Sequence, residues 1–506
     1  MPEAETTTST ALTPIRRESF GYDQARHLLL RAGFGGTPAQ IQTLVEWGPE
    51  RAVDYLVDLR NAPKYPVDGA AFSSSIMGPP TEETRARYRR ARQTNDEEGL
   101  ARLRLERQRR QAADRTQMRE IQQWWLTRLI ETPRPLEEKM TLFWHGHFAT
   151  SYRTIEDSYH MFMQNVLYRT HAVGNFGALM HQVIRDPAML EYLDNNDSRK
   201  NKPNENLARE LMELFGLGVG NYSEQDIKEG ARALTGYTFE DDRFVFVQKS
   251  HDNGAKRILG RASNMDGDDF VDTILAQPAC ASFISRKLYK FFAADVPESG
   301  TIERQQARAL RELASLLRRT KYNLGPVLKK LFLSEHFYSD AVVNQRIKSP
   351  VELIVGSIRS LRTPVRDLNI LLDALSLMGQ NIFFPPSVAG WDGERSWINT
   401  STLYVRQNIL AYLLTGKTPR GYDALADEQR FDPSAVLGQL RAADPAAAKD
   451  PTRVIEYLLR FTIGHAPEKA RAELAGLTQR TGGELTDDMI TGLLLLITAM
   501  PEYQLT

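Results

Sequence analysis

Cysteine is almost missing from this chain of 506 residues, since Cys280 is the only one. No disulfide can therefore form within the chain, which is typical of a reducing compartment. Long hydrophobic runs are also missing, because the longest, residues 493–500, is far too short to cross a bilayer. The first twenty residues contain acids and no apolar core, so they do not resemble a secretory signal. We expect a cytoplasmic protein, although a chain whose signal had been removed for export would look the same.

Net charge is missing as well, because 64 lysines and arginines balance 64 aspartates and glutamates. No overall field attracts the chain to nucleic acid or to a membrane. The sequence also lacks a Walker phosphate loop, an HExxH motif, paired CxxC motifs and a GxSxG elbow. Residues 216–220, GLGVG, follow a predicted helix rather than a strand, so they indicate a helix stop and not a dinucleotide loop.

The hydrophobic periodicity predicts a mainly α fold, a large helical domain with a small β-hairpin embellishment. The hairpin is expected at about residues 243–260, with two short strands around a turn at Asn253 and Gly254. The expected segments, in chain order, are a disordered tail at 1–18, a main helical domain at 19–420, a linker at 421–450 and a C-terminal helical segment at 451–506.

A very charged stretch at residues 81–119, dominated by arginine, is expected to form a helical hairpin inserted into the main domain. Gly99 is the candidate for its turn. Such charge runs are usually solvated helix faces, and the alternative is a surface for an anionic partner or a polynucleotide. Aromatic residues are nearly absent from it, which argues against base stacking and so against a nucleic-acid partner.

Residues 203–216 divide into two faces when they are placed on a helix at 100° per residue. The polar face consists of Glu205, Asn206, Arg209, Glu210 and Glu213. On a surface, ion pairs at these spacings would contribute only tenths of a kcal/mol. In a cleft, Glu210 or Glu213 would bind a metal or act as a base, with Arg209 orienting an anionic group.

Two histidines, His145 and His147, lie in the motif WHGHF and suggest a metal site, because neutral imidazole suits zinc, iron, copper and nickel. Positions two apart on a helix point about 200° apart, so both rings reach one ion only if the helix ends at Gly146. The alternative is one buried, hydrogen-bonded histidine beside a capping one.

A possible calcium loop precedes the polar helix. Its candidate ligands are Asp194, Asn196, Ser198 and Glu205, at positions one, three, five and twelve of an EF-hand-like loop. Arg199 stands where that loop needs glycine, and Pro203 is atypical. The alternative is an Asx-rich turn that caps the helix beginning near Asn204.

The segment His251-Asp252-Asn253-Gly254-Ala255-Lys256 places a histidine beside an acid and a turn. His251 is either a catalytic acid–base group or ligand, supported by Asp252 and Lys256, or an exposed histidine at a hairpin turn.

Eight motifs follow one another along the chain: LRAGFG at 30–35, WHGHF at 144–148, DPAML at 186–190, the 203–216 helix, ARALTG at 231–236, HDNGAK at 251–256, KSPVE at 348–352 and VAGW at 388–391. Together they resemble a bacterial family known as domain of unknown function 1800. The resemblance that they carry covers about residues 22 to 420. The resemblance implies a bacterial protein, often accompanied by a sulfatase-like partner, and it implies no established reaction.

The motifs rich in histidine and glutamate favour a metal-dependent enzyme, a hydrolase or an oxidoreductase with a divalent metal ion in a helical core. The metal ligands would be His145, His147, Glu210 and Glu213, and the catalytic groups Arg209, His251, Asp252 and Lys256. A second hypothesis is a non-catalytic binding or assembly protein, in which the polar motifs are structural and residues 81–119 form the docking surface. A third is a structural protein stabilised by calcium. The first hypothesis requires its side chains to converge in one cleft.

Overall fold

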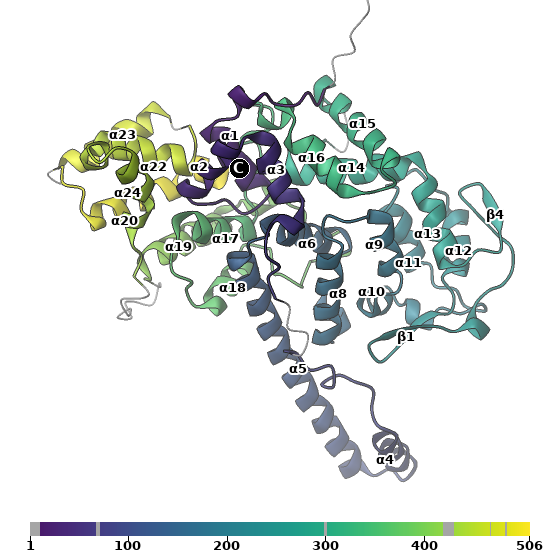
Figure 1. The fold of residues 1–506 in the computed structure, drawn as a ribbon. Helices are drawn as coiled ribbons and strands as arrows, with labels where there is room; N and C mark the ends of the chain where they lie inside the picture. Colours follow the sequence, from purple (N-terminus) through teal and green to yellow (C-terminus); the bar gives the residue numbers. More distant parts are fainter. Residues whose placement is uncertain (1–10, 67–70, 298–300, 418–429, 466, 481–482) are drawn as a thin grey trace, which may run out of the picture.

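The computed structural model describes residues 11–66, 71–297, 301–417, 430–465, 467–480 and 483–506. Helices dominate the described chain, and its strands form two short antiparallel hairpins (Figure 1). The expected fold class, mainly α with a small β embellishment, is therefore confirmed. In these described ranges no helix is long and apolar enough to cross a membrane.

Most helices are short, and one spans 35 residues. The first group is α1 (Tyr22–Arg31), α2 (Pro38–Trp47), α3 (Pro49–Val57), α4 (Glu82–Gln93), α5 (Glu97–Glu131), α6 (Pro135–His147), α7 (Tyr152–Ile155), α8 (Ser158–Thr170), α9 (Phe176–Val183), α10 (Pro187–Tyr192), α11 (Asn206–Glu213) and α12 (Glu224–Ala233). The second is α13 (Gly267–Ala276), α14 (Pro278–Phe292), α15 (Arg304–Arg319), α16 (Leu324–Phe332), α17 (Pro350–Leu361), α18 (Leu368–Leu377), α19 (Thr400–Thr415), α20 (Pro433–Val436), α21 (Gly438–Ala443), α22 (Pro451–Thr462), α23 (Glu468–Arg480) and α24 (Asp487–Ala499).

Several helices begin and end where side-chain chemistry dictates. Thr37 accepts a hydrogen bond from the Gln40 amide at the start of α2, and Pro38 fills the first helical position, where no amide hydrogen is needed. Ser223 and Asp226 form a capping box at the start of α12. Gly236, with φ of 82°, lies just beyond the end of that helix, in the left-handed conformation that glycine adopts at many helix ends.

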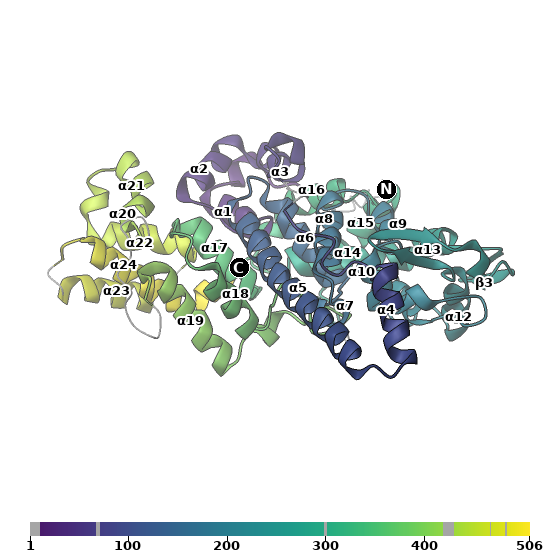
Figure 2. The ribbon, with the colours of Figure 1, turned by 90° about the horizontal axis from the view of Figure 1, so that it is seen from below.

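The centre of the molecule is formed by α6, which packs against α3, α5 and α8. Nearly every residue of α6 is buried, the charged ones included. The C-terminal half of α5 packs against α8, α17 and α18 beside it (Figure 2). A helix buried on all sides has no solvated face, so its polar residues must find partners inside the protein.

The single hairpin expected at about residues 243–260 is wrong. The strands β1 (Tyr237–Glu240) and β2 (Arg243–Phe246) pair with each other, and so do β3 (Lys256–Ile258) and β4 (Arg261–Ser263). The two turns place Asp241 (φ 56°) and Gly260 (φ 85°) in the left-handed region. Asn253 and Gly254 instead lie in the loop between the hairpins, where the Gly254 amide donates to Asp252.

The expected tail, linker and C-terminal segment differ from the prediction in how they contact the rest of the protein. Residues 1–10 of the expected tail lie outside the described residues, and residues 11–18 are not disordered, because Leu12 and Ile15 are buried and the Ile15 amide donates to the Leu333 carbonyl. Of the expected linker at 421–450, residues 421–429 lie outside the described residues, and α20 and α21 follow from residue 433. The C-terminal helices contact the main body where α24 packs against α19, and an antiparallel β-bridge joins Ile347 to Leu505.

Candidate functional site

The two histidines of α6 face different neighbours. The helix continues through Gly146 to His147, so it does not end where a shared metal site requires. The side chain of Asn165 on α8 donates to Nε2 of His145 over 2.9 Å, which occupies the lone pair that a metal would use. The ring of His145 also packs against Trp125 and Tyr168. His145 therefore serves as a buried core residue.

His147 lies among aromatic rings on another side of α6. Its Nε2–H donates to the carbonyl of Phe215, 3.0 Å away, and its Nδ1 has no partner. Burial lowers the pKa of both His145 and His147 to about 3, so both rings are neutral at pH 7. The alternative to a metal site was one buried, hydrogen-bonded histidine beside a capping one. Both rings are instead buried and hydrogen-bonded, and neither caps the helix.

A buried ionic cluster surrounds Glu138, about two helical turns before His145 on α6. Its carboxylate accepts hydrogen bonds from Arg128 Nε at 3.0 Å, Trp125 Nε1 at 3.0 Å and Arg169 Nε at 2.7 Å and Nη2 at 2.9 Å. Glu138 and Arg128 are fully buried, and Arg169 nearly so. Four donors on one carboxylate fix α5, α6 and α8 relative to one another. This cluster fastens helices together.

The polar face predicted for residues 203–216 is present on α11, but it lies at the surface. Arg209 is about one-third exposed and pairs with Glu224 over 2.9 Å and with Glu205 over 3.2 Å. The Tyr222 hydroxyl donates to Glu213. Burial, and then the charge of Glu213, raise the pKa of Glu210, which is half-buried. This face is an ion-pair network between α11 and α12, with one carboxyl of raised pKa.

The proposed calcium ligands bind different partners within the protein. Asn196 donates to Glu191 over 2.7 Å, and Ser198 Oγ accepts from the Asn204 amide over 3.1 Å. Glu205 pairs with Arg209. The side chain of Asn204 accepts from the Asn206 amide at 2.9 Å, where α11 begins. Asp194 takes φ of 55° at the turn, so the alternative of an Asx-rich capping turn describes this loop better than a calcium loop.

The loop from His251 to Lys256 is fixed by its own hydrogen bonds. His251 is buried, and its Nδ1 lies 2.8 Å from the Thr235 carbonyl, so it is not the exposed turn histidine of the alternative. The Asp252 carboxylate receives Arg232 Nε at 2.7 Å, which lowers its pKa to about 2. Lys256 donates to the carbonyls of Asp252 and Gly254. All three predicted catalytic side chains of this loop therefore have structural partners.

The predicted metal and catalytic residues do not come together. Within the described ranges, no group of three or more histidine, cysteine, aspartate or glutamate side chains is arranged to hold a metal ion. The requirement that His145, His147, Glu210, Glu213 and His251 converge in one cleft is therefore not met. A bound metal ion stays a prediction that only a measurement on the protein can test.

Two of the sequence motifs, at residues 30–35 and 348–352, do meet, at a lysine that sequence reasoning missed. Lys139 on α6 donates to the Gly33 carbonyl over 2.8 Å and to Glu352 Oε1 over 2.5 Å. Glu352 also accepts from the Ser349 amide in the capping box that starts α17. No local pattern in the sequence marks Lys139, because its partners are 106 and 213 residues away.

The charged stretch forms the most exposed feature of the fold. We use the name arginine arm for α4 together with residues 97–116 of α5, which project from the body as two adjacent helices (Figure 1). The turn between them lies at residues 94–96, and Gly99 is already inside α5. Arg87 pairs with Glu106 between the two helices over 3.3 Å, and Arg119 anchors the base of the arm to Asp373 over 2.7 Å.

Most arginines of the arginine arm have nothing to bind within the chain. Residues 81–116 contain eleven arginines and seven acids. In the described chain, the side chains of seven exposed arginines make no hydrogen bond and no ion pair: Arg85, Arg90, Arg92, Arg104, Arg107, Arg109 and Arg115. Tyr88 and Leu105 expose about half of their surface among them. The arm thus presents unpaired guanidinium groups and two apolar side chains.

The comparisons with known proteins give a family and no function. The model of a family described as a protein of unknown function, DUF1800, matches residues 27–505, nearly the whole chain. No curated protein and no solved structure is significantly similar to the chain.

Proposed function

Because the chain belongs to the DUF1800 family, whose function is unknown, its role has to come from its own residues, and we propose that it is a non-catalytic binding or assembly protein. The observation that carries this proposal is the arginine arm, a rigid projection with seven unpaired arginines. The polar motifs that first suggested an enzyme have structural partners, as they would in such a protein.

An acidic protein is the partner that this surface fits best. Guanidinium groups bind carboxylates through paired hydrogen bonds, and arginine is enriched at protein interfaces. A polynucleotide fits less well, because Tyr88 is the only aromatic residue of the arm and acids lie at its tip, at Asp96, Glu97 and Glu98. The sulfatase-like protein that the family resemblance associates with such chains is the first partner to test.

The test compares two variants with the same change in charge. The arm variant carries Arg104→Glu, Arg107→Glu and Arg109→Glu. The control carries Arg304→Glu, Arg308→Glu and Arg311→Glu on α15, and these three side chains are likewise exposed and unpaired among the described residues. Binding to the immobilised sulfatase-like protein is measured at low and at physiological salt. We expect the arm variant to bind at least about tenfold more weakly, since like charges at an interface cost more than 1.4 kcal/mol, and the control to bind as the unaltered protein does.

Each result decides one part of the proposal. Equal weakening in both variants would show general charge attraction and would remove the arm from the proposal. If the unaltered protein does not bind, the sulfatase-like protein is not its partner. A metal-dependent enzyme is the rival hypothesis, and near-stoichiometric iron, zinc, copper or manganese in protein purified without chelator would favour it over a binding protein.

A further inference from the structure

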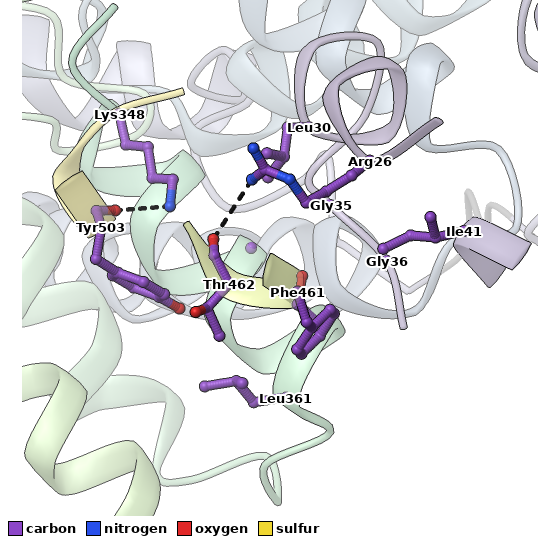
Figure 3. Close-up of a pocket in the computed structure, with 12 residues that line it drawn as sticks. Arg26, Leu30, Gly35, Gly36, Ile41, Lys348, Leu361, Phe461, Thr462 and Tyr503 are labelled. Atoms are coloured by element: carbon purple, nitrogen blue, oxygen red, sulfur yellow. Dashed lines mark hydrogen bonds between the residues drawn. The ribbon is translucent and has the colours of Figure 1, made fainter. Parts of the chain in front are cut away.

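A small cavity lies inside the body, where α1, α17 and α22 meet the last residues of the chain (Figure 3). Its volume is about 20 Å³, enough for one particle of the size of a water molecule. Two cations, Arg26 and Lys348, line it, and no carboxylate does. Figure 3 shows their charged ends reaching toward the same space.

Arg26 has too few partners for a buried cation. Its side chain is about 5 % exposed, and its Nε has no hydrogen-bond partner. Its Nη1 and Nη2 reach the carbonyls of Thr462 and Ile463 only at 3.5 Å, the outer limit of a hydrogen bond. An arginine buried in this way keeps unsatisfied donors beside the cavity, which costs free energy unless an acceptor is present.

Lys348 is in a similar position on the other side of the cavity. Its Nζ donates to the Tyr503 carbonyl over 2.7 Å and lies 4.1 Å from the centre of the Tyr503 ring. This bond uses one of the three ammonium hydrogens, and among the described residues the other two have no acceptor. The Ser360 hydroxyl also lines the cavity, and it makes no hydrogen bond to any residue that the structure describes.

The carboxylates that act on these two cations are committed to other groups. Asp23 pairs with Arg460 over 3.3 Å, and Glu352 accepts from Lys139 over 2.5 Å. Arg406 adds another buried positive charge, because its Nη2 donates to the main-chain carbonyl of the cavity's lysine. Positive charge therefore exceeds negative charge around the cavity, and buried charges are normally compensated.

We propose that this cavity binds a small inorganic anion of halide size, held between the side chains of Arg26 and Lys348. A halide accepts hydrogen bonds from several donors at once, as the guanidinium, ammonium and hydroxyl groups here require. The cavity volume excludes phosphate esters and organic acids. This site is independent of the arginine arm and does not depend on the proposed function.

Bromide identifies the site directly. Crystals of the full chain grown in sodium bromide are expected to show an anomalous scattering peak within hydrogen-bonding distance of both Arg26 and Lys348. A peak found only elsewhere, or a water molecule without anomalous signal in this cavity, would overturn the proposal. This measurement needs no variant, so it does not depend on whether an altered cavity still folds.

Thermal unfolding provides an independent test in solution. The protein is prepared in sodium gluconate and titrated with sodium chloride at constant ionic strength. The unfolding midpoint should rise by about 2.5 °C at one hundred times the dissociation constant, given an unfolding entropy of about 2.1 cal/mol/K per residue. Arg26→Met should abolish the rise, and Arg359→Met, which removes a partly buried arginine outside the cavity, should retain it. The same rise in all three proteins would indicate a general salt effect and would refute the site.

Discussion

Replacing Glu138 by glutamine should destabilise the protein more than any replacement of a surface carboxylate. Glutamine keeps the shape of the side chain, but it removes the charge that Arg128 and Arg169 share. Both arginines would stay buried without a counter-charge. Removal of one partner from a buried ion pair costs about 3–5 kcal/mol. With an unfolding entropy of about 2.1 cal/mol/K per residue over this chain, a loss of about 4 kcal/mol lowers the unfolding midpoint by about 4 °C.

Scanning calorimetry of Glu138→Gln measures this shift, and Glu106→Gln is the matched control. Glu106 also pairs with an arginine, Arg87, but at the surface, where both side chains are about half exposed. Its loss should cost less than about 1 kcal/mol. A shift below 1 °C for Glu138→Gln, or equal shifts in the two variants, would refute the view that this cluster fastens α5, α6 and α8 together.

The same cluster predicts how the difference depends on pH. Burial alone would raise the pKa of Glu138, but Arg169 and Arg128 overcome it, so the pKa lies below its ordinary value. A carboxyl with a lowered pKa in the folded state stabilises the protein above its unfolded pKa of about 4.3, and this contribution is lost as the pH falls through the folded pKa. The midpoints of the unaltered protein and of Glu138→Gln should therefore converge below about pH 4.

The remaining predictions concern three other places. Burial lowers the pKa of Lys348 to about 7, below its value of about 10.4 in the unfolded chain. In gluconate, the unfolding midpoint should therefore rise with pH between these two values. Lys348→Met should remove this rise in a series of calorimetric scans. Asp252→Ala should cost about 1–3 kcal/mol in thermal unfolding, because Arg232 and the Gly254 amide lose their acceptor, and an unchanged midpoint would show the loop to be held otherwise. Addition of EDTA should leave the midpoint unchanged, since Asn165 occupies the lone pair of His145, and a fall that zinc or manganese reverses would restore the metal hypothesis.

Local patterns in the sequence predicted the helical fold well. The caps at Thr37 and Ser223 and the stop at Gly236 depend on neighbours within four residues, so they are visible without the structure. The hairpin prediction failed because strand pairing depends on which segments meet. Asn253 and Gly254 have turn chemistry but no strands to join, whereas Asp241 and Gly260 do.

The candidate site depends, in the same way, on contacts between distant segments. Helical spacing showed correctly that His145 and His147 point apart, but not whether the helix would end at Gly146. In the structure the helix continues to His147, and the loop containing Gly390 packs so closely against Gly146 that a side chain at Gly390 would meet the Gly146 carbonyl. The sequence likewise gives no sign of the cluster at Glu138, because its charge is compensated by arginines 10 and 31 residues away, inside a helix that is buried on all sides.

The continuity of α5 has a mechanical consequence. One uninterrupted helix of 35 residues forms both part of the arginine arm and one wall of the core, a length of about 52 Å at 1.5 Å per residue. A hinge would let the arm swing, but here the arm can tilt only if the packing around Trp125 and Arg128 yields. A partner bound to the arm is therefore held at a fixed distance and angle from the body. A force applied to the tip of the arm acts as a torque on the centre of the protein.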